Sequence, residues 1–397
     1  MHVNSQTHTT INTDRGGHIT SFEKPGMRAT NFRADGRAAH IEHSRPDGSR
    51  MVVDRGLRGE RRVEVVRPGG VRVVTVGRRG FVERPLRPGF VSRTSVIGGR
   101  TEVRVYRTLA YGNIHYYAYV PRVYYNPAFY GWANRPWGAP VAFAWGWGPA
   151  PWYGFYGGYF APSPYYPDAS LWLTDYVLAE NLQLAYENRM AAGGEESANQ
   201  PPPAEPTSAV MLTPEVKQMI AEEVRQQLAA EQAAAAQPAA AQPSPTASEA
   251  PPALDPKLRI FVASTPLNLT AADGQTCALT PGDIIERTSR NPTDDGKIAV
   301  NVMNSKAGDC PVDFASVLDV SALQDMHNQF REQIAAGMEK LASNQGKGGL
   351  PAGPAASPRQ AAEGQAPPAD DARELLEKQT QEADQTEAEI AQGSTGG

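Results

Sequence analysis

The stretch RRVEVVRPGGVRVVTV, residues 61–76, indicates how the N-terminal part of the chain folds. Its valines alternate with Arg62, Glu64 and Arg72, which is the two-residue period of a strand buried on one face. The PGG sequence at 68–70 between the two runs is typical of a tight turn. The stretch therefore predicts two antiparallel strands joined by a short connection.

Similar turn sequences recur on both sides, about 10 to 12 residues apart, which is hairpin spacing. We therefore expect residues 31–110 to form an antiparallel β-meander of about six or seven strands, after a poorly ordered N-terminus at 1–30. The strands present an arginine-rich outer face. The residues assigned to this basic face are Arg50, Arg62, Arg72 and Arg104.

Charge is distributed unevenly along the chain. Residues 1–107 hold 21 Lys and Arg against 10 Asp and Glu, while the whole chain has a net charge of −5. Almost all of these cations are arginines, which bind carboxylates or phosphates bidentately and stack on aromatic rings. The expected partner is anionic or aromatic, and a neighbouring segment of the same chain would serve.

An aromatic block follows, from about Tyr111 to Tyr166, and every tryptophan lies between Trp132 and Trp172. Its glycines and prolines oppose helix formation, so we expect no membrane span in the uncharged part at 137–167. Such a sequence suits contact better than catalysis. The contact surface is expected to consist of Tyr130, Trp132, Trp137, Trp145, Trp147, Trp152, Tyr153 and Tyr156.

Helical patterns and linkers follow this block. A helix capped by Asp168 is expected to end the aromatic module at 111–190, and a linker at 191–212 separates it from an amphipathic helix at 213–232. Thr213-Pro214-Glu215 gives the second helix its start signal. Its thin apolar stripe predicts either homo-oligomerisation or docking on a neighbouring domain. The Ala/Pro/Gln tract at 233–256 is expected to be a linker.

Residues 257–345 are the best candidate for a small globular domain. Five short apolar runs separated by tight turns predict a small β-barrel, and a helix beginning at Ser321 is expected to cover it. Residues 346–397 are rich in Pro, Ala, Gln and Glu, so we expect a disordered tail. A single acidic helix at about 371–392 is the alternative.

Cys277 and Cys310 are the only cysteines, and both lie at turns of the expected barrel. Two cysteines at matching turns of one small domain favour a disulfide and hence an oxidising compartment, with unpaired thiols as the alternative. Two cysteines are too few ligands for a metal site. His40 and His43 are expected on opposite faces of one strand, so they do not converge on a metal either.

No sequence pattern provides a nucleophile with a nearby base. We therefore expect no catalytic residue, no metal and no cofactor, and the chain is not expected to be an enzyme. Arginines beside aromatic rings could bind nucleic acid through phosphates and bases. The charges stop where the aromatics begin, which disfavours that partner, although it is kept as the alternative function.

The stretch PAFYGWANRPWGAPVAFAWGWG at 127–148, within the region Pro127–Tyr186, resembles an uncharacterised group of bacterial exported or envelope proteins with Tyr/Trp-Gly-rich modules. The basic turns are weakly similar to YD-type hairpin repeats of bacterial surface proteins. The run LNLTAADGQTCALTPGDIIERTS at 267–289 resembles a bacterial Src-homology-3-like barrel, a binding module. None of these resemblances implies catalytic residues.

The N-terminal residues MHVNSQTHTTINTDRGG have neither a basic start nor an apolar run, so no signal peptide is expected in this sequence. The resemblance and the expected disulfide nevertheless imply an extracytoplasmic location. We predict a multi-domain, mainly β protein with helices and long disordered linkers. Its expected function is that of a non-enzymatic envelope or secreted scaffold protein, with envelope polysaccharide or protein as partner.

Overall fold

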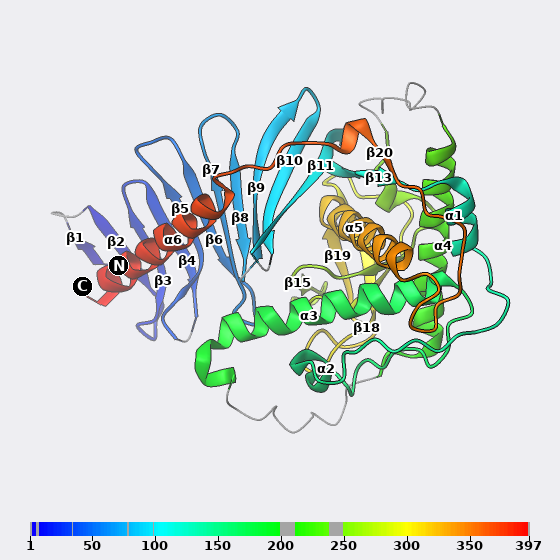
Figure 1. The fold of residues 1–397 in the computed structure, drawn as a ribbon. Coiled ribbons are helices and arrows are strands. Elements are labelled where there is room, and N and C mark those ends of the chain that lie inside the picture. Colours follow the sequence, from blue (N-terminus) through cyan, green and yellow to red (C-terminus); the bar gives the residue numbers. More distant parts are fainter. Residues whose placement is uncertain are drawn as a thin grey trace. The chain divides into compact units, whose positions relative to one another are not determined.

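The computed structural model describes residues 2–4, 8–33, 35–77, 79–97, 99–198, 211–237 and 249–395. The chain forms two compact units (Figure 1). The first unit contains Met1–Val103, Glu187–Glu195 and Ala366–Gly397, and the second contains Arg104–Tyr186 and Glu196–Gln365. The expected linker segments at 199–210 and 238–248 lie outside the described residues.

In the first unit, strands β1 to β10 follow one another in sequence order in one antiparallel sheet. Their bounds are β1 His2–Asn4, β2 Thr9–Thr13, β3 Ile19–Lys24, β4 Met27–Phe32, β5 Ala38–Ser44, β6 Arg50–Arg55, β7 Arg61–Val66, β8 Arg72–Val76, β9 Arg79–Arg87 and β10 Phe90–Ile97. In the register, Val53 lies opposite Val63 and Val65 opposite Val73. The meander expected from the valine pattern is therefore present.

The meander begins earlier than the sequence predicts. Strands β1 to β4 occupy most of the N-terminal segment that was expected to be poorly ordered. Gly26 has a φ of 77° in the turn between β3 and β4, a left-handed conformation that glycine adopts at little cost. Few residues of these strands are buried in the apolar core, namely Ile11 in β2, Phe22 in β3, and Met27 and Ala29 in β4. The alternation of apolar and polar residues is therefore weak in this part of the sequence.

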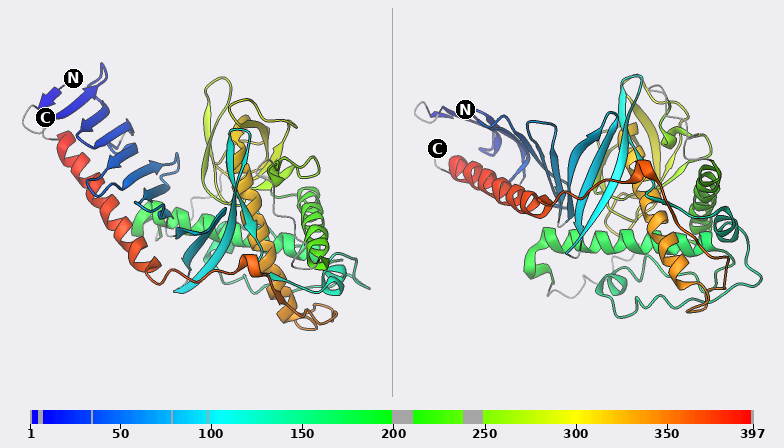
Figure 2. Two further views of the ribbon diagram at one scale, coloured as in Figure 1. Left: turned by 90° about the horizontal axis from the view of Figure 1, so that it is seen from above. Right: turned by 45° about the horizontal axis from the view of Figure 1, so that its top comes forward.

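Helix α6 (Ala372–Thr395) packs on one face of this sheet and contacts strands from β3 to β10 (Figure 2). Ala383 and Ile390 join the apolar core that Phe22, Met51 and Val65 form. The prediction of a disordered tail at 346–397 is therefore wrong, and the alternative of a single acidic helix is correct. The segment before it contains β20 (Arg359–Gln360) and the short helix η3 (Ala362–Gly364).

In the second unit, residues 260–319 form two small antiparallel sheets. One has the order β14 (Ile260–Val262), β17 (Ile284–Arg287), β18 (Lys297–Asn304) and β19 (Ala315–Asp319), and the other pairs β15 (Leu267–Thr270) with β16 (Thr276–Leu279). The expected barrel does not close, because β15 and β16 pair only with each other and β14 and β19 remain edges. The expected helix, α5 (Val320–Asn344), packs on this core through Leu323 and Met326.

The second unit contains further elements. They are β11 (Arg100–Tyr111), which begins in the first unit, β12 (Ile114–Val120), β13 (Val123–Tyr124), α1 (Pro127–Ala133), α2 (Pro151–Phe155), α3 (Ala169–Ala198), of which residues 187–195 belong to the first unit, α4 (Pro214–Ala236) and the short helix η2 (Pro252–Leu254). Helices α3 and α4 extend to Ala198 and Ala236, into both segments expected to be linkers. Alanine has the highest helix propensity, and the alanines in these two segments outweigh the low helix propensity of the glycines after Met190.

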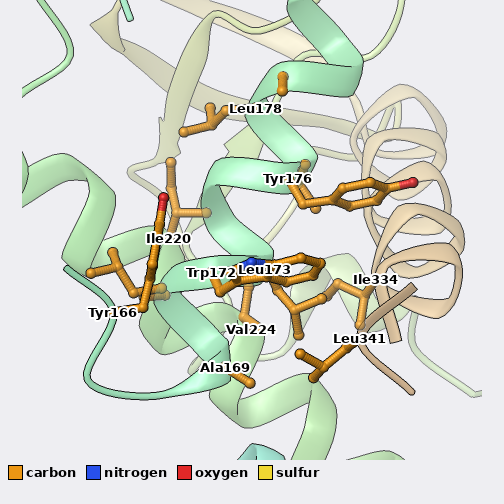
Figure 3. Packing of buried hydrophobic residues seen from close by; sticks show 14 of the residues in the cluster. Tyr166, Ala169, Trp172, Leu173, Tyr176, Leu178, Ile220, Val224, Ile334 and Leu341 are labelled. Atoms are coloured by element: carbon orange, nitrogen blue, oxygen red, sulfur yellow. The ribbon is translucent and has the colours of Figure 1, made fainter. Parts of the chain in front are cut away.

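The start signals of these helices act as expected. The Asp168 carboxylate accepts from the Leu171 N–H at 3.1 Å, and the Thr213 hydroxyl accepts from the Val216 N–H at 3.3 Å. The apolar stripe of α4, which includes Ile220 and Val224, is buried in the second unit beside α3 and α5 (Figure 3). The docking alternative therefore accounts for this stripe. Within the described ranges, no helix has the length and apolar character needed to cross a membrane.

Candidate functional site

One face of the N-terminal sheet is a binding surface for the acidic helix α6. On this face, basic side chains flank an apolar strip that lies under the helix. Both kinds of side chain can share the face because residues two apart on a strand point to the same side of the sheet. Arg45 donates to Glu382 at 2.7 Å, and Arg61 donates to Asp384 at 2.6 Å. Further ion pairs join Arg61 and Arg55 to Glu387, Lys24 to Glu389, and Arg84 to Asp371.

A buried amide also fixes the helix to the strands. The side chain of Gln379 is fully buried and donates to the carbonyls of Val63 and Val73, at 3.0 and 2.7 Å. These two carbonyls belong to neighbouring strands, so a single side chain connects α6 to both. The anionic partner expected from the arginine content is, for this face, the C-terminal segment of the same chain.

The opposite face of the sheet has cations and anions in alternation. Arg50 pairs with Glu42, and both Arg62 and Arg72 pair with Glu64. In the second unit, Arg104 pairs with Glu332 at 2.8 Å. All four residues assigned to the basic face therefore have carboxylate partners, and this arrangement does not favour a nucleic-acid interface.

Glu83 is the most deeply buried anion on that opposite face. Arg72 and Arg93 donate to its two carboxylate oxygens at 2.9 and 2.7 Å, and its side chain is 3% exposed. Burial alone would raise the pKa of Glu83, but the two guanidinium groups outweigh burial and hold the pKa below its usual range. The group remains an anion, and its role is to neutralise two arginines.

The expected aromatic contact surface is largely an internal core. Tyr130, Trp137 and Trp152 are buried, with 1%, 8% and 6% of their surface exposed. Trp145 stacks on Trp147 and on Trp172, with ring centroids 4.2 and 4.6 Å apart. The interpretation of these rings as an exposed surface is therefore wrong for most of their area, because α3, α4 and α5 have apolar faces that the rings cover.

A buried polar group orders this aromatic core. Asp175 of α3 accepts from the hydroxyl of Tyr166 and from the ammonium of Lys217, both at 2.7 Å. Tyr166 in turn accepts from the indole N–H of Trp145 at 2.6 Å. Burial raises the pKa of Tyr166, and the Asp175 carboxylate raises it further, so the phenol remains a donor.

A pocket of about 580 Å³ opens at the edge of the aromatic block. Two of the expected contact residues, Trp132 and Trp137, form part of its wall. Arg135 and Gln232 contribute polar groups to it. The remaining lining residues are Pro127, Ala128, Gly131, Pro136, Gly138, Pro351 and Ala352.

The aromatic wall of this pocket is closely packed. Trp132 stacks on Phe129 and on Trp137, with centroids 5.5 and 5.6 Å apart. A Cβ atom on Gly353 would lie 2.7 Å from the Trp132 ring, so only glycine fits behind it. The Gln232 amide donates to the Pro127 carbonyl at 3.1 Å, which fixes the polar side of the pocket.

Arg135 is the only charged residue in the pocket lining, and its side chain is exposed. The lining contains no nucleophile, base or acid, so the pocket can bind a ligand but offers no group for catalysis. The sequence identified the two tryptophans, but not Arg135 or Gln232. Arg135 lies just after α1 and Gln232 lies on α4, so the two residues are more than ninety positions apart in the chain.

The disulfide between Cys277 and Cys310 is present, as expected. His40 contacts Asp54 on the outer face of the sheet at 2.7 Å, while His43 contacts Thr386 of α6 at 3.2 Å. The two histidines therefore lie on opposite faces. In the parts of the chain that the structure describes, no group of three or more His, Cys, Asp or Glu residues could hold a metal ion.

One buried cluster of charged side chains could not be predicted from the sequence. Lys306, Asp283 and Asp309 lie together beneath Tyr159, and their side chains are at most 6% exposed. Each residue sits in a segment typical of a surface turn, PGD at 281–283 and SKAGD at 305–309, so composition predicts solvent exposure.

The comparisons with known proteins return no relative. No protein-family model, no curated protein and no solved structure matches this chain significantly.

Proposed function

We propose that this chain is a non-enzymatic envelope or secreted protein that binds an acidic glycan in the Trp132–Trp137 pocket. The observation that carries the proposal is the lining itself, which combines a closely packed apolar wall with one exposed guanidinium and one hydrogen-bonded amide. Ligand pockets are typically concave, mostly apolar and equipped with a few polar groups that orient the ligand.

The chemistry of the lining favours a sugar with a carboxylate. The C–H faces of a sugar ring are apolar and fit the proline and tryptophan wall. The Arg135 guanidinium matches a carboxylate bidentately, and the free carbonyl of the Gln232 amide can accept from a hydroxyl. A neutral glycan would leave the arginine without a partner.

The disulfide supports an extracytoplasmic location, since such bonds persist in oxidising compartments. The remainder of the molecule serves as the scaffold. In this proposal the aromatic block supports the pocket from within, and the arginine-rich sheet holds α6.

Titration calorimetry of the full chain tests the ligand. We expect polygalacturonate, a polymer of acidic sugars, to bind, and neutral amylose to bind at least about tenfold more weakly, the effect of one charge-assisted contact. Arg135→Ala should reduce the affinity for polygalacturonate by a similar factor. Arg290→Ala, which removes an exposed arginine of the same unit outside the pocket, should leave it unchanged.

Equal loss in both variants would show non-specific attraction to a polyanion and would contradict the proposal. Binding of a proline-rich peptide in place of polygalacturonate would assign the pocket to peptides. Location is tested separately, by fractionating cells that express the protein with its upstream sequence. Protein found only in the cytoplasm, with both thiols free, would contradict the envelope assignment.

A further inference from the structure

Lys306 and Asp283 meet at the ends of two neighbouring strands. Asp283 directly precedes β17 and Lys306 closely follows β18, and in the register Ile284 lies opposite Asn304. The Lys306 ammonium is 2.5 Å from Asp283 Oδ1. Backbone pairing therefore holds the amine against the carboxyl group.

Water has little access to this pair. The side chains of Lys306 and Asp283 are 4% and 0% exposed. The ring of Tyr159 lies over the ammonium, 5.5 Å from its centroid, and the Tyr159 hydroxyl donates to the Gly282 carbonyl at 2.9 Å. A water molecule would have to enter the core to reach these two groups.

The atoms around the pair fix both reacting groups. Asp283 Oδ2 accepts from the Thr280 N–H at 2.8 Å, and Oδ1 also accepts from the Lys306 N–H at 3.0 Å. Lys306 Nζ additionally donates to the Pro281 carbonyl at 3.0 Å and lies 3.3 Å from the Thr280 carbonyl. Such positioning is equivalent to a high local concentration, with effective molarities of about 10⁵ M or more in well-oriented systems.

Asp309 is a second carboxyl group at the same place. Its Oδ2 is 3.5 Å from Lys306 Nζ and accepts from the Thr280 hydroxyl at 2.6 Å. Burial raises the pKa of Asp283 to about 7, with Lys306 opposing the rise and Asp309 adding to it. The Asp283 carboxyl group therefore takes up a proton at a pH close to neutral.

We propose that Lys306 and Asp283 condense to an intramolecular amide bond, with Asp309 as the group that moves the proton. The ammonium gives up a proton, and the neutral amine attacks the Asp283 carboxyl carbon. The C–N bond forms, a C–O bond of the carboxyl group breaks, and the oxygen leaves as water. Ammonium and carboxylate together become one amide and one water, so no further reagent is required.

The energetic reason is the cost of burying charge. Two desolvated ions are expensive in a protein interior even when they are paired. The amide is neutral, and its carbonyl can keep the bond from the Thr280 N–H. The cross-link would lie inside the loop that Cys277 and Cys310 close, so two covalent links would hold the same turns.

Intact mass spectrometry of the full chain, after reduction and alkylation of both cysteines, tests the cross-link. We expect a mass lower than that of the sequence by one water. Trypsin does not cleave after an acylated lysine, so we expect a branched peptide joining Ile260–Arg287 to Ile298–Arg331. An unshifted mass, together with a Lys306 amine that is methylated after denaturation, would overturn the proposal and leave an ordinary buried ion pair.

Variants distinguish the roles of the three residues. Asp283→Ala should have the full mass calculated from the variant's sequence, because it has no carboxyl group at position 283 to lose water. Asp283→Asn should form the same amide with loss of ammonia in place of water, which gives a product of the same mass as the wild type. Asp309→Asn should slow the reaction, so that a mixture of linear and cross-linked chains is seen soon after synthesis. Complete cross-linking of Asp309→Asn at the wild-type rate would remove Asp309 from the mechanism.

Discussion

Arg45 donates to the carboxylate of Glu382 at 2.7 Å, although the two residues lie 337 positions apart in the chain. Their side chains are 12% and 22% exposed, so solvent screens this pair less than a surface pair. Because Glu382 is on α6 and Arg45 follows β5, the contact links the C-terminal helix to the N-terminal sheet. The first unit is completed by a segment that is made after all of its strands.

Replacing Glu382 with glutamine should loosen α6. The substitution leaves the guanidinium of Arg45 without an anion in a half-buried position, which costs about 1–2 kcal/mol. We therefore expect backbone amides of α6 to exchange with deuterium about tenfold faster, as measured by mass spectrometry. Glu377→Gln, at an exposed position of the same helix beyond its first turn, is the matched control and should leave exchange unchanged.

A high salt concentration should act in the same direction as Glu382→Gln but more weakly, because partly buried pairs are screened less than exposed ones. If Glu382→Gln and Glu377→Gln exchange alike, then the apolar strip and Gln379 hold the helix and the ion pairs do not.

Gly337 is a close-approach position between α5 and α3. A Cβ atom there would lie 2.6 Å from the Leu173 side chain and 2.9 Å from the Tyr176 ring. Gly337→Ala should therefore destabilise the second unit by about 1–3 kcal/mol through overpacking, despite the better helix propensity of alanine. Gly154→Ala in α2, where no atom lies within 4 Å, should be neutral or slightly stabilising in urea unfolding.

Removing the disulfide should destabilise the second unit. The bond joins residues 33 positions apart, and a loop of that size corresponds to about 3–4 kcal/mol in the chain-entropy model. The paired substitution Cys277→Ser with Cys310→Ser should lower the urea midpoint accordingly. Addition of a reductant to the wild type should produce the same shift, and it should have no effect on the double variant.

His327 should make stability depend on pH. Burial lowers its pKa from 6.5 to about 3, and Arg331 adds to this effect. Between these values the unfolded chain takes up a proton and the folded chain does not, so stability falls as the pH falls. The loss is about 2 kcal/mol between pH 7 and pH 5.

In chains that have not formed the Lys306–Asp283 amide, the raised pKa of Asp283 acts with the opposite sign, because the folded state then binds the additional proton as the pH falls. The contribution of His327 is therefore measured as a difference between the wild type and His327→Gln. We expect the stability of the variant relative to the wild type to improve as the pH is lowered. A difference that is constant with pH would show that His327 takes up a proton equally in both states.

The sequence predicted those elements whose signals are local. The valine alternation at 61–76 indicated the meander, Thr213-Pro214-Glu215 marked the start of α4, and the two cysteines at turns indicated the disulfide. Each of these predictions depends on residues that are close together in the sequence or, like the two cysteines, are the only residues of their type.

The interface of α6 could not be predicted from such signals. The residues that α6 buries in the sheet include Ala372, Gln379, Ala383 and Thr386, which are small or polar, and Ile390. A stripe of this kind has little apolar character, and the acidic composition around it is typical of a disordered tail. The basic side chains on the sheet and the carbonyls that bind Gln379 add to this small apolar contact, and both come from strands about 300 residues earlier in the chain.

The aromatic block shows a different limit of prediction from the sequence. Its composition indicates a large area for contact, but composition does not tell whether that area covers a partner or the chain itself. Trp172 of α3 is fully buried against Trp145 and Phe143, so the contact is internal. The pocket at the edge of the block takes its polar groups from Arg135, which follows α1, and from Gln232 of α4.

The position of α6 determines when the first unit can fold during synthesis. Strands β1 to β10 emerge from the ribosome long before Ala372, and until then Phe22, Met51 and Val65 have no helix to cover them. A nascent chain therefore exposes an apolar face between two rows of basic side chains while the whole second unit is being made. Any product that ends before residue 372 retains this exposed face, which makes truncated chains prone to aggregation and to capture by chaperones.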